Sequence, residues 1–491
     1  FQQDKFTSIT TRGSGLEKPY IVTLASAQDF SVNQNIDNSA TYSFFGRLNY
    51  SFDDTYLLTV NVRRDGSSRF SEENRYELFP SIGLGWKLHN TFTLPEWLSD
   101  LKLRGGIGQV GNQFIANYAY QSTVNRGIPY QFNGTRVFGG AVTINRDPGI
   151  KWETRTTRSV GVDAVLFNGK IEFSAEYYSN TSEDILMAQP IPFSVGSVDP
   201  SIITNAGSMQ NSGIELSAIY HQNIGELRLD IAPNFYTVHN EILDLGNVEN
   251  LPGTGTYNEV GRSLGEHYGF VFDGIFQDQT EIDAHATQFP GTAPGDIRFK
   301  DISGPDGVPD GVVNDEFDRV YLGQGMPTYY YGLNITAGYK SFDLTIFGQG
   351  AGGNLINSNL YRGLMPTSSF TNWHEDILDR WTSENPSNTV PRVVWNDPNQ
   401  NGRNSDRPGW LQKGDYFRIQ TISIGYTLPQ SLISKAKLQS VRVYGTLQNV
   451  LTFQHYKGYN PDFQAGILNP GFDFGTFPRP RTSMLGVQIK F

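Results

Sequence analysis

The sequence contains no cysteine, so it can form neither a disulfide framework nor a cysteine-ligated metal or iron–sulfur site. It also lacks any run close to the roughly 20 apolar residues that a membrane-spanning helix needs, which excludes a helical membrane protein. Basic residues are fewer than acidic ones, 38 against 49, and the formal net charge is −11. Because nucleic acid attracts a basic surface, this balance argues against nucleic acid as the main partner.

Aromatic residues, by contrast, are abundant: 7 Trp, 25 Tyr and 32 Phe, together 13% of 491 residues. Disordered chains are poor in aromatics, so disorder is excluded. The length indicates about three domains at roughly 150 residues each, although one closed β-sheet can absorb a chain this long. Phe1 is not a start methionine and no signal peptide follows it, so we expect a piece of a longer protein. Phe491 ends a clean strand, and we expect it to be the natural C-terminus.

Apolar and polar residues alternate with a period of two along most of the chain. Such alternation is typical of strands with one apolar and one polar face. The clearest alternating segments cover residues 44–52, 56–62, 82–88, 160–166, 171–177, 214–220, 227–231, 342–346, 441–447 and 485–491. In the last of these, Leu485, Val487 and Ile489 share one face while Gln488 and Lys490 occupy the other.

Two architectures use such strands: a soluble sandwich buries the apolar faces, and a membrane barrel turns them toward lipid. Many of these strands run roughly 9 to 13 residues, whereas soluble strands have a mode of about 5 to 6. The polar faces also carry charges that suit a water-filled lumen, at Arg63, Arg104, Asp163, Glu172, Glu176, Arg228 and Arg442. We therefore predict an all-β fold, an antiparallel transmembrane β-barrel set in a lipid bilayer, with about fourteen strands in this chain. That number fits either a mid-sized porin or most of a larger barrel.

The connections between strands are of two kinds. Short ones such as Asp53-Asp54, Asn168-Gly169 and Lys340-Ser341 predict hairpin turns. Long ones are expected on the extracellular side, over residues 113–150, 182–212, 240–265, 274–328, 350–414 and 453–480. Only 278–287 and 371–383 look briefly helical. The strand at residues 416–426 changes phase midway, which predicts a β-bulge.

Specific segments carry a resemblance to a known family. They are FGRLNYSFDDTYLLTVNVRRDGSSRF, ELFPSIGLGWKL, LKLRGGIGQVGNQ, GIKWETRTTRSVGVDAVLFNGKIEFSAEYY, NSGIELSA, GRSLGEHYGFVFDGIFQ, GDIRFKDISGPDGVPDGVVND, GDYFRIQTISIGYTLP and PRPRTSMLGVQIKF. In this order, over residues 40–491, they make the chain resemble the C-terminal barrel portion of SusC/RagA-type TonB-dependent outer-membrane transporters.

This resemblance implies most of a 22-stranded barrel in the bacterial outer membrane, with the N-terminal plug and the TonB-contacting region absent from this chain. It further implies a SusD-like surface lipoprotein as partner and active import of oligosaccharides or oligopeptides. Dimers of transporter–lipoprotein units are also expected. A passive porin and a surface adhesin remain alternatives from other functional classes.

Asp and Gly residues concentrate in residues 301–315. Oxygen ligands at alternate positions around a Gly turn can bind Ca²⁺, and Asp301, Ser303, Asp306 and Asp310 are the candidate ligands. Pro305 interrupts the usual calcium-loop spacing, so an ordinary Asp-Gly turn is the alternative. We expect no required cofactor, and any calcium here to be structural.

Four tryptophans, Trp373, Trp381, Trp395 and Trp410, fall in the 350–414 connection, close in sequence to Arg403 and Arg407. Flat rings beside charged groups can stack on and hydrogen-bond a sugar or peptide, which makes the four tryptophans candidate substrate-binding residues. The alternative is that so long a loop needs them as its own core.

No catalytic site is expected. The glycine spacing at residues 106–111 and the GRSLG segment at residues 261–265 resemble enzyme motifs, but the helix that either motif needs does not follow. The seven His are scattered and predict no metal site. We therefore predict that the chain is not an enzyme.

Overall fold

The computed structural model describes residues 1–16, 20, 23–196, 199–365, 372–463 and 465–491. The predicted connections 182–212, 350–414 and 453–480, and the expected helix at 371–383, each include residues outside these ranges. Contacts divide the chain into two compact units. One holds residues 1–85, 105–158 and 180–208, and the other holds residues 86–104, 159–179 and 209–491.

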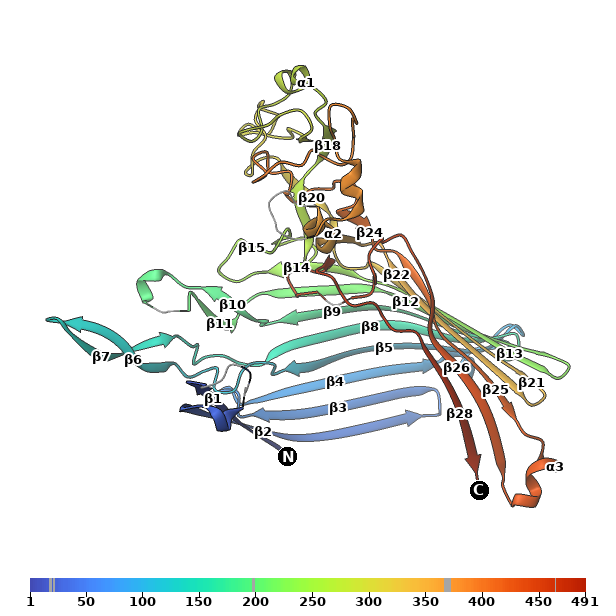
Figure 1. Cartoon of the computed structure of the whole chain (residues 1–491). Helices are drawn as coiled ribbons and strands as arrows, with labels where there is room; N and C mark the ends of the chain where they lie inside the picture. The colour runs from blue at the N-terminus through green and yellow to red at the C-terminus, as the bar shows by residue number, and fades with distance from the viewer. Residues whose placement is uncertain (17–19, 21–22, 197–198, 366–371, 464) are drawn as a thin grey trace. The chain divides into compact units, whose positions relative to one another are not determined.

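The strands of the main sheet follow one another in chain order, interrupted only by the elements of the long connections (Figure 1). They are β1 (Gln2–Ser14), β2 (Asp29–Phe52), β3 (Tyr56–Ser67), β4 (Tyr76–Lys87), β5 (Leu98–Asn112), β8 (Glu153–Leu166), β9 (Ile171–Glu183), β12 (Ser208–Ile224), β13 (Leu227–Thr237), β21 (Tyr329–Tyr339), β22 (Phe342–Gly352), β25 (Tyr416–Thr427), β26 (Ser440–Gln454) and β28 (Thr482–Lys490). A further strand, β14 (His239–Asp244), pairs with β12. The antiparallel sheet and its strand order confirm the predicted all-β class.

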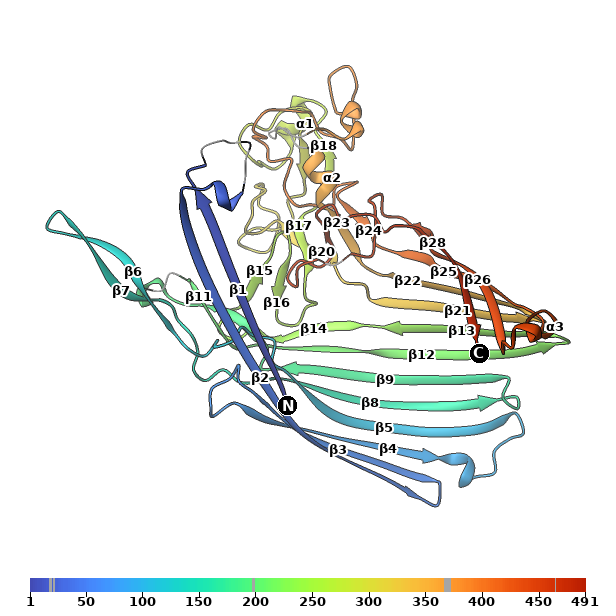
Figure 2. The same ribbon diagram turned by 60° about the horizontal axis from the view of Figure 1, so that its bottom comes forward.

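Tight turns join neighbouring strands where the sequence predicted them. Asp53 and Asp54, between β2 and β3, have φ of 51° and 44°, the left-handed geometry typical of hairpin turns. Lys340, between β21 and β22, has φ of 54°. In the first unit, β1 and β2 pair over their full facing lengths, from Gln2 opposite Thr41 to Ser14 opposite Asp29 (Figure 2).

The predicted β-bulge in β25 is confirmed. The register of β25 shifts against β26 between Ile419 and Thr421, and the β22 register shifts at the same place. Gln420 is therefore the extra residue opposite β22. Because of this extra residue, the apolar side chains after the bulge lie on the same face of the sheet as those before it.

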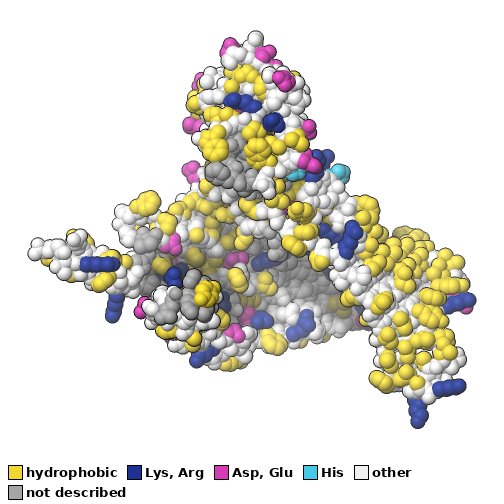
Figure 3. Space-filling model, viewed as in Figure 1, with side chains coloured by type: hydrophobic (Ala, Val, Ile, Leu, Met, Phe, Trp, Pro, Cys, Tyr) yellow, Lys and Arg dark blue, Asp and Glu magenta, His cyan; other side chains and the backbone are white. Residues whose placement is uncertain are grey.

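The apolar face of the sheet is exposed. Leu84 and Val160 are each 60% exposed and Ile424 is 55% exposed, as are apolar residues on most other strands. Figure 3 shows hydrophobic side chains covering the visible face of the C-terminal strands, with basic side chains near their ends. A soluble sandwich would bury this face, so its exposure supports the barrel over the sandwich.

Most of the buried core lies instead in the connections, although Phe79 of β4 also belongs to it. In the first unit, one buried cluster includes Phe70, Phe79 and Trp152. In the second unit, one cluster is built on Phe270, Ile297, Phe299 and Val313, and another on Met365, Ile377 and Val390. The long connections therefore fold into packed structure of their own.

Short strands and helices organise these connections. The strands are β6 (Thr123–Phe132), β7 (Thr135–Ile144), β10 (Leu186–Pro190), β11 (Ser201–Asn205), β15 (Asn250–Pro252), β16 (Tyr257–Glu259), β17 (Glu266–Phe270), β18 (Phe272–Ile275), β19 (Ile297–Phe299), β20 (Arg319–Gln324), β23 (Leu355–Ser358), β24 (Leu411–Lys413) and β27 (Phe472–Asp473). The helices are α1 (Gln279–Ala284), α2 (Asn359–Leu364) and α3 (Gln430–Ile433). Helix α1 lies in the expected segment 278–287, and a 3-10 turn at Glu375–Asp379 lies in 371–383, but α2 and α3 were not predicted. Within the described residues, no helix is both long and apolar enough to cross a bilayer.

Candidate functional site

The polar face of the sheet in the second unit carries ion pairs between strands. Arg104 on β5 donates from Nε to Oδ1 of Asp163 on β8 at 3.2 Å, and it also pairs with Glu176 on β9. Lys102 Nζ lies 3.5 Å from Asp163 Oδ2, and the Ser174 hydroxyl donates to Asp163 at 2.8 Å. All these residues come from the polar phase of the alternation, so charges on this face are balanced by their cross-strand neighbours.

Like Arg104 and Glu176, another pair on this face reaches across an intervening strand. Arg442 on β26 donates from Nε and Nη2 to the two carboxylate oxygens of Asp343 on β22, at 2.8 and 2.5 Å. Gly425 of β25 lies between them, and a Cβ there would collide with the guanidinium. Because glycine has no side chain, Arg442 and Asp343 can pair directly over the backbone of β25.

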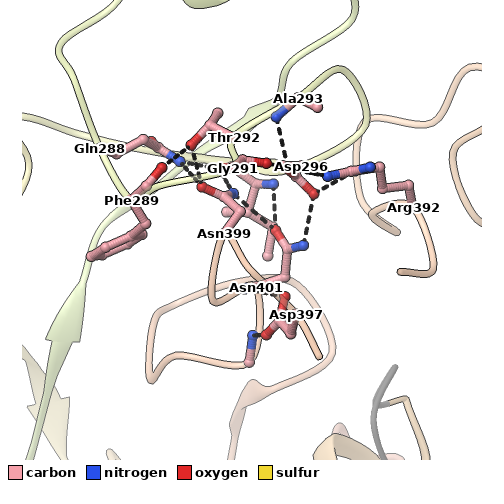
Figure 4. Close-up of polar contacts among 12 residues, drawn as sticks. Gln288, Phe289, Gly291, Thr292, Ala293, Asp296, Arg392, Asp397, Asn399 and Asn401 are labelled. Carbon is pink, nitrogen blue, oxygen red and sulfur yellow. Dashed lines mark hydrogen bonds and ion pairs between the residues drawn. The ribbon is translucent and has the colours of Figure 1, made fainter. Parts of the chain in front are cut away.

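In the connections of the second unit, a buried polar joint links residues 288–297 to residues 392–401. Figure 4 shows its centre, Asp296, with its carboxylate directed at Arg392 and Asn401. Arg392 donates from Nε and Nη2 at 2.8 and 2.9 Å, Asn401 Nδ2 donates at 2.9 Å, and the Ala293 N–H donates at 2.9 Å. Asp296 is fully buried, so these donors replace the water that the carboxylate loses.

Amide side chains complete the polar joint. Asn399, also fully buried, accepts from Gln288 Nε2 at 2.9 Å and from the Thr292 hydroxyl at 2.6 Å. Gln288 Nε2 and Asn399 Nδ2 both donate to the carbonyl of Ile297. Two segments about a hundred residues apart in the sequence are thereby fixed to each other by satisfied hydrogen bonds.

The four candidate substrate-binding tryptophans are not brought together. Trp373 and Trp395 are more than half exposed. Trp381 donates from Nε1 to Gln277 Oε1 at 2.9 Å, and its ring packs against the bare backbone of Gly295. For this residue, the alternative of a tryptophan serving the loop's own packing matches the contacts. Substrate binding by the tryptophans stays a prediction.

Trp410 is buried and lies in the wall of a cavity of ≈ 540 Å³. We call this space the arginine cavity, because Arg362, Arg392 and Arg407 line it together with Asp397 and Trp410. Arg407 was noted in the sequence for its nearness to the tryptophans. Arg362 was missed, since nothing in the sequence of α2 marks it as a lining residue.

The candidate calcium ligands mostly bond to nearby backbone. Asp301 Oδ2 accepts the Gly311 N–H at 2.8 Å, and Asp310 Oδ1 accepts the Val312 N–H at 2.9 Å. Asp301 Oδ1 is buried without a hydrogen-bond partner. Over the described part of the chain, no three His, Cys, Asp or Glu side chains form a group that could hold a metal ion. Calcium binding at Asp301, Ser303, Asp306 and Asp310 therefore stays a prediction.

A residue that was not predicted organises this acidic segment. Asp318 is fully buried and accepts the backbone N–H groups of Ile302, Ser303 and Asn314, at 2.7, 3.3 and 2.7 Å. A single carboxylate thus holds both ends of the Asp-Gly turn through backbone hydrogen bonds.

His267, on strand β17 of the connections, is a fully buried histidine. Its Nε2 lies 2.9 Å from the Leu355 carbonyl oxygen, and its Nδ1 has no hydrogen-bond partner. Burial lowers the pKa of His267 from its ordinary 6.5 to about 4, because a charged imidazolium would lose its hydration. The ring is therefore neutral and structural.

Comparison with known proteins agrees with this architecture. The family model described as TonB dependent receptor-like, beta-barrel matches residues 5–450. TonB-dependent receptor P3 of Formosa agariphila is 30% identical over 483 residues, which cover 93% of this chain and 46% of the relative. TonB-dependent receptor SusC of Bacteroides thetaiotaomicron is 28% identical over 468 residues, covering 91% of this chain and 43% of the relative.

The solved structure of the RagAB peptide transporter superimposes with a TM-score of 0.81 at 24% identity, covering 100% of this chain and 52% of that one. The chain therefore spans about half the length of the relatives it matches. These findings confirm the predicted SusC/RagA-type barrel and its place in the bacterial outer membrane. The chain belongs to the TonB-dependent receptor-like β-barrel family, a family of transporters rather than enzymes.

Proposed function

We propose that this chain is the barrel portion of a TonB-dependent importer that takes up oligosaccharides or oligopeptides across the outer membrane. The observation that carries the proposal is the match of residues 5–450 to the receptor barrel family. The energy would come from TonB, acting through an N-terminal plug that fills the barrel in the whole protein. No covalent chemistry is assigned to the chain itself.

The packed connections support a substrate-selecting role over a passive one. A general porin needs only an open, water-filled path, whereas these connections hold a buried polar joint and a cavity of ≈ 540 Å³. Such a cavity falls within the about 300–1,000 Å³ typical of small-ligand sites. Rigid connections around a cavity can recognise a substrate before transport.

A SusD-like surface lipoprotein is the proposed partner. Two of the proteins that this chain resembles are SusC itself and a chain of the RagAB transporter, which supports a two-component assembly here. We further propose that two such transporter–lipoprotein units form a dimer.

The test is to extract the protein from outer membranes in mild detergent, measure its native mass, and sequence every component. We expect a plug-bearing polypeptide and a lipoprotein to accompany this chain. Uptake of labelled oligomers should then stop when a protonophore collapses the proton gradient.

Other outcomes favour the alternatives. If uptake continues unchanged without the gradient and the isolated protein conducts ions freely, it is a porin. If it binds surfaces and neither transports nor conducts, it is an adhesin. Either result contradicts the proposed import.

A further inference from the structure

The arginine cavity contains a buried cation without a carboxylate partner. Arg407 is 2% exposed and donates from Nε to the Thr389 carbonyl at 3.3 Å, while its guanidinium carbon lies 4.7 Å from the centre of the Trp410 ring. Within the described part of the chain, it makes no ion pair. Burial lowers the pKa of Arg407 to about 10, because the guanidinium loses its hydration.

Arg392, which lines the same cavity, has a carboxylate that neutralises its charge. Its guanidinium binds both oxygens of Asp296 in the polar joint. Removing water from a cation is costly unless an anion replaces it. Unlike Arg392, Arg407 is therefore a buried guanidinium that an added anion would stabilise.

Arg362 of α2 approaches the same tryptophan. Its guanidinium carbon lies 5.4 Å from the Trp410 ring centre, and Nη2 donates to the Gly402 carbonyl at 2.6 Å. Arg362 also makes no ion pair with a described residue, and burial lowers its pKa. Two guanidinium groups are thus held in the cavity wall, each within stacking distance of one indole.

The carboxylate in the cavity wall is already occupied. Asp397 accepts the Asn401 N–H on Oδ1 and the Gly402 N–H on Oδ2, both at 2.8 Å. With Arg392 neutralised by Asp296, the remaining lining charges are Arg362, Arg407 and Asp397, which leaves one net positive charge. Gly402 is exposed, so the cavity wall reaches the surface at that point.

We propose that the arginine cavity binds a carboxylate group of the substrate through Arg362 and Arg407, with the attached ring or chain lying against Trp410. Arginine presents a planar fork of N–H donors that matches the two oxygens of a carboxylate. A carboxylate would supply the anion that Arg407 lacks. The substrate class is therefore an oligomer that carries a free carboxylate.

This assignment of a substrate class rests on the proposed import function. The same carboxylate chemistry occurs in a uronic-acid oligosaccharide and at the C-terminus of a peptide. Two matched probe pairs separate these sources: trigalacturonate against its methyl ester, and triglycine against triglycine amide. In each pair the first member carries free carboxylate and the second has it blocked as an ester or an amide.

The experiment measures binding of each probe to the whole transporter, with its lipoprotein, by titration calorimetry in detergent. We expect the member of one pair that carries the free carboxylate to bind roughly tenfold or more tightly than its ester or amide, as a charge-assisted hydrogen-bond pair implies. The pair that discriminates identifies the source, and discrimination in both supports a general carboxylate site.

Two variants and a matched control locate the effect. Arg362→Gln and Arg407→Lys should each reduce the preference for the free carboxylate at least several-fold, because Arg362→Gln removes a charge and Arg407→Lys removes the planar fork of donors. Arg380→Gln alters an arginine in the same connection that does not line the cavity, and should leave the preference intact. Hydrogen exchange of the connections checks that each variant is folded.

The results separate this inference from the import proposal. Wild-type protein that imports oligomers but binds both members of each pair equally overturns the carboxylate site and leaves import standing. A preference that persists in both folded variants also overturns it. A preference that the variants abolish, in a protein without gradient-driven uptake, retains the site and rejects the importer.

Discussion

The sheet and the connections of this protein differ in which side chains they bury. On the sheet, apolar side chains such as Leu84 and Val160 are exposed, and charges such as Arg442 and Asp343 pair while still partly open to solvent. In the connections, clusters of apolar side chains such as Phe270 and Phe299 are buried, and Asp296 has no exposed surface at all. An arginine–carboxylate pair therefore only neutralises charge on the sheet, as at Arg442 and Asp343, whereas in the connections the pair of Arg392 and Asp296 also holds two segments together.

This difference gives the two regions different tolerance to mutation. A membrane barrel gains stability from its closed hydrogen-bond ladder and its apolar outer face, so single charges on its polar face matter little. Packed connections depend on satisfied buried polar groups, each costly to leave without a partner. Mutations chosen in matched pairs, one in each region, test this distinction.

The largest effect is expected from Asp296→Ala. The change leaves the Arg392 guanidinium, Asn401 Nδ2 and the Ala293 N–H without their acceptor. Breaking a buried pair by removing one partner costs about 3–5 kcal/mol. Limited proteolysis should then cut the connections rapidly, while the barrel keeps its heat-modifiable migration on a gel. Connections that stay as resistant as wild type would contradict the structural role of the polar joint.

Acid should weaken the connections through His267. Its pKa is about 4 when folded and 6.5 ordinarily, so the unfolded segment binds a proton that the folded one excludes. The stability is fully present above pH 6.5 and is lost as the pH falls toward 4, by about 3 kcal/mol at most. Hydrogen exchange of β17 and β23 between pH 7.5 and 4.5, corrected for intrinsic rates, measures this loss.

The control for the histidine is His267→Gln, which can still donate to the Leu355 carbonyl but does not titrate. We expect the variant to show a much flatter pH dependence over the same range. An unchanged slope in the variant would assign the acid sensitivity to other groups.

A third comparison uses two glycines. In Gly269→Ala the new Cβ would collide with the carbonyl of Asn404, which is itself fixed by the Phe270 N–H at 2.9 Å. Overpacking of this kind costs about 1–3 kcal/mol. Gly46→Ala on β2 meets nothing within 4 Å and should be neutral or slightly stabilising. Thermal unfolding and limited proteolysis of the connections measure the stability of both variants. Equal stability of the two variants would contradict the expected difference between the sheet and the connections.

The sheet could be predicted from the sequence because its signals are local. Alternation with a period of two marks each strand, paired turn residues such as Asp53 and Asp54 mark the hairpins, and even the bulge at Gln420 appears as a change of phase. Each signal lies within a few residues, so no knowledge of the partner strand is needed.

The connections could not be predicted in the same way. Asp296 and Arg392 are 96 residues apart, and nothing near either residue identifies the other. The four tryptophans formed one group in the sequence, yet the fold buries Trp410 and exposes Trp373. Arg362 entered the candidate site only because α2 places it in the cavity wall. The positions of these side chains depend on packing between segments far apart in the sequence, and no local sequence pattern predicts that packing.

The smallest effect is expected from the sheet counterpart of the first variant, Asp343→Asn. The Asp343–Arg442 pair is partly exposed on both sides, and such pairs contribute about 0–1 kcal/mol. The amide of the variant still accepts one hydrogen bond from Arg442, and the strand ladder around it stays complete. Thermal unfolding of the barrel should therefore shift by no more than a few degrees, and the connections should keep wild-type resistance to protease. A loss as large as that of Asp296→Ala would mean that the polar face of the sheet is packed as tightly as the connections, and the contrast between the two regions would fail.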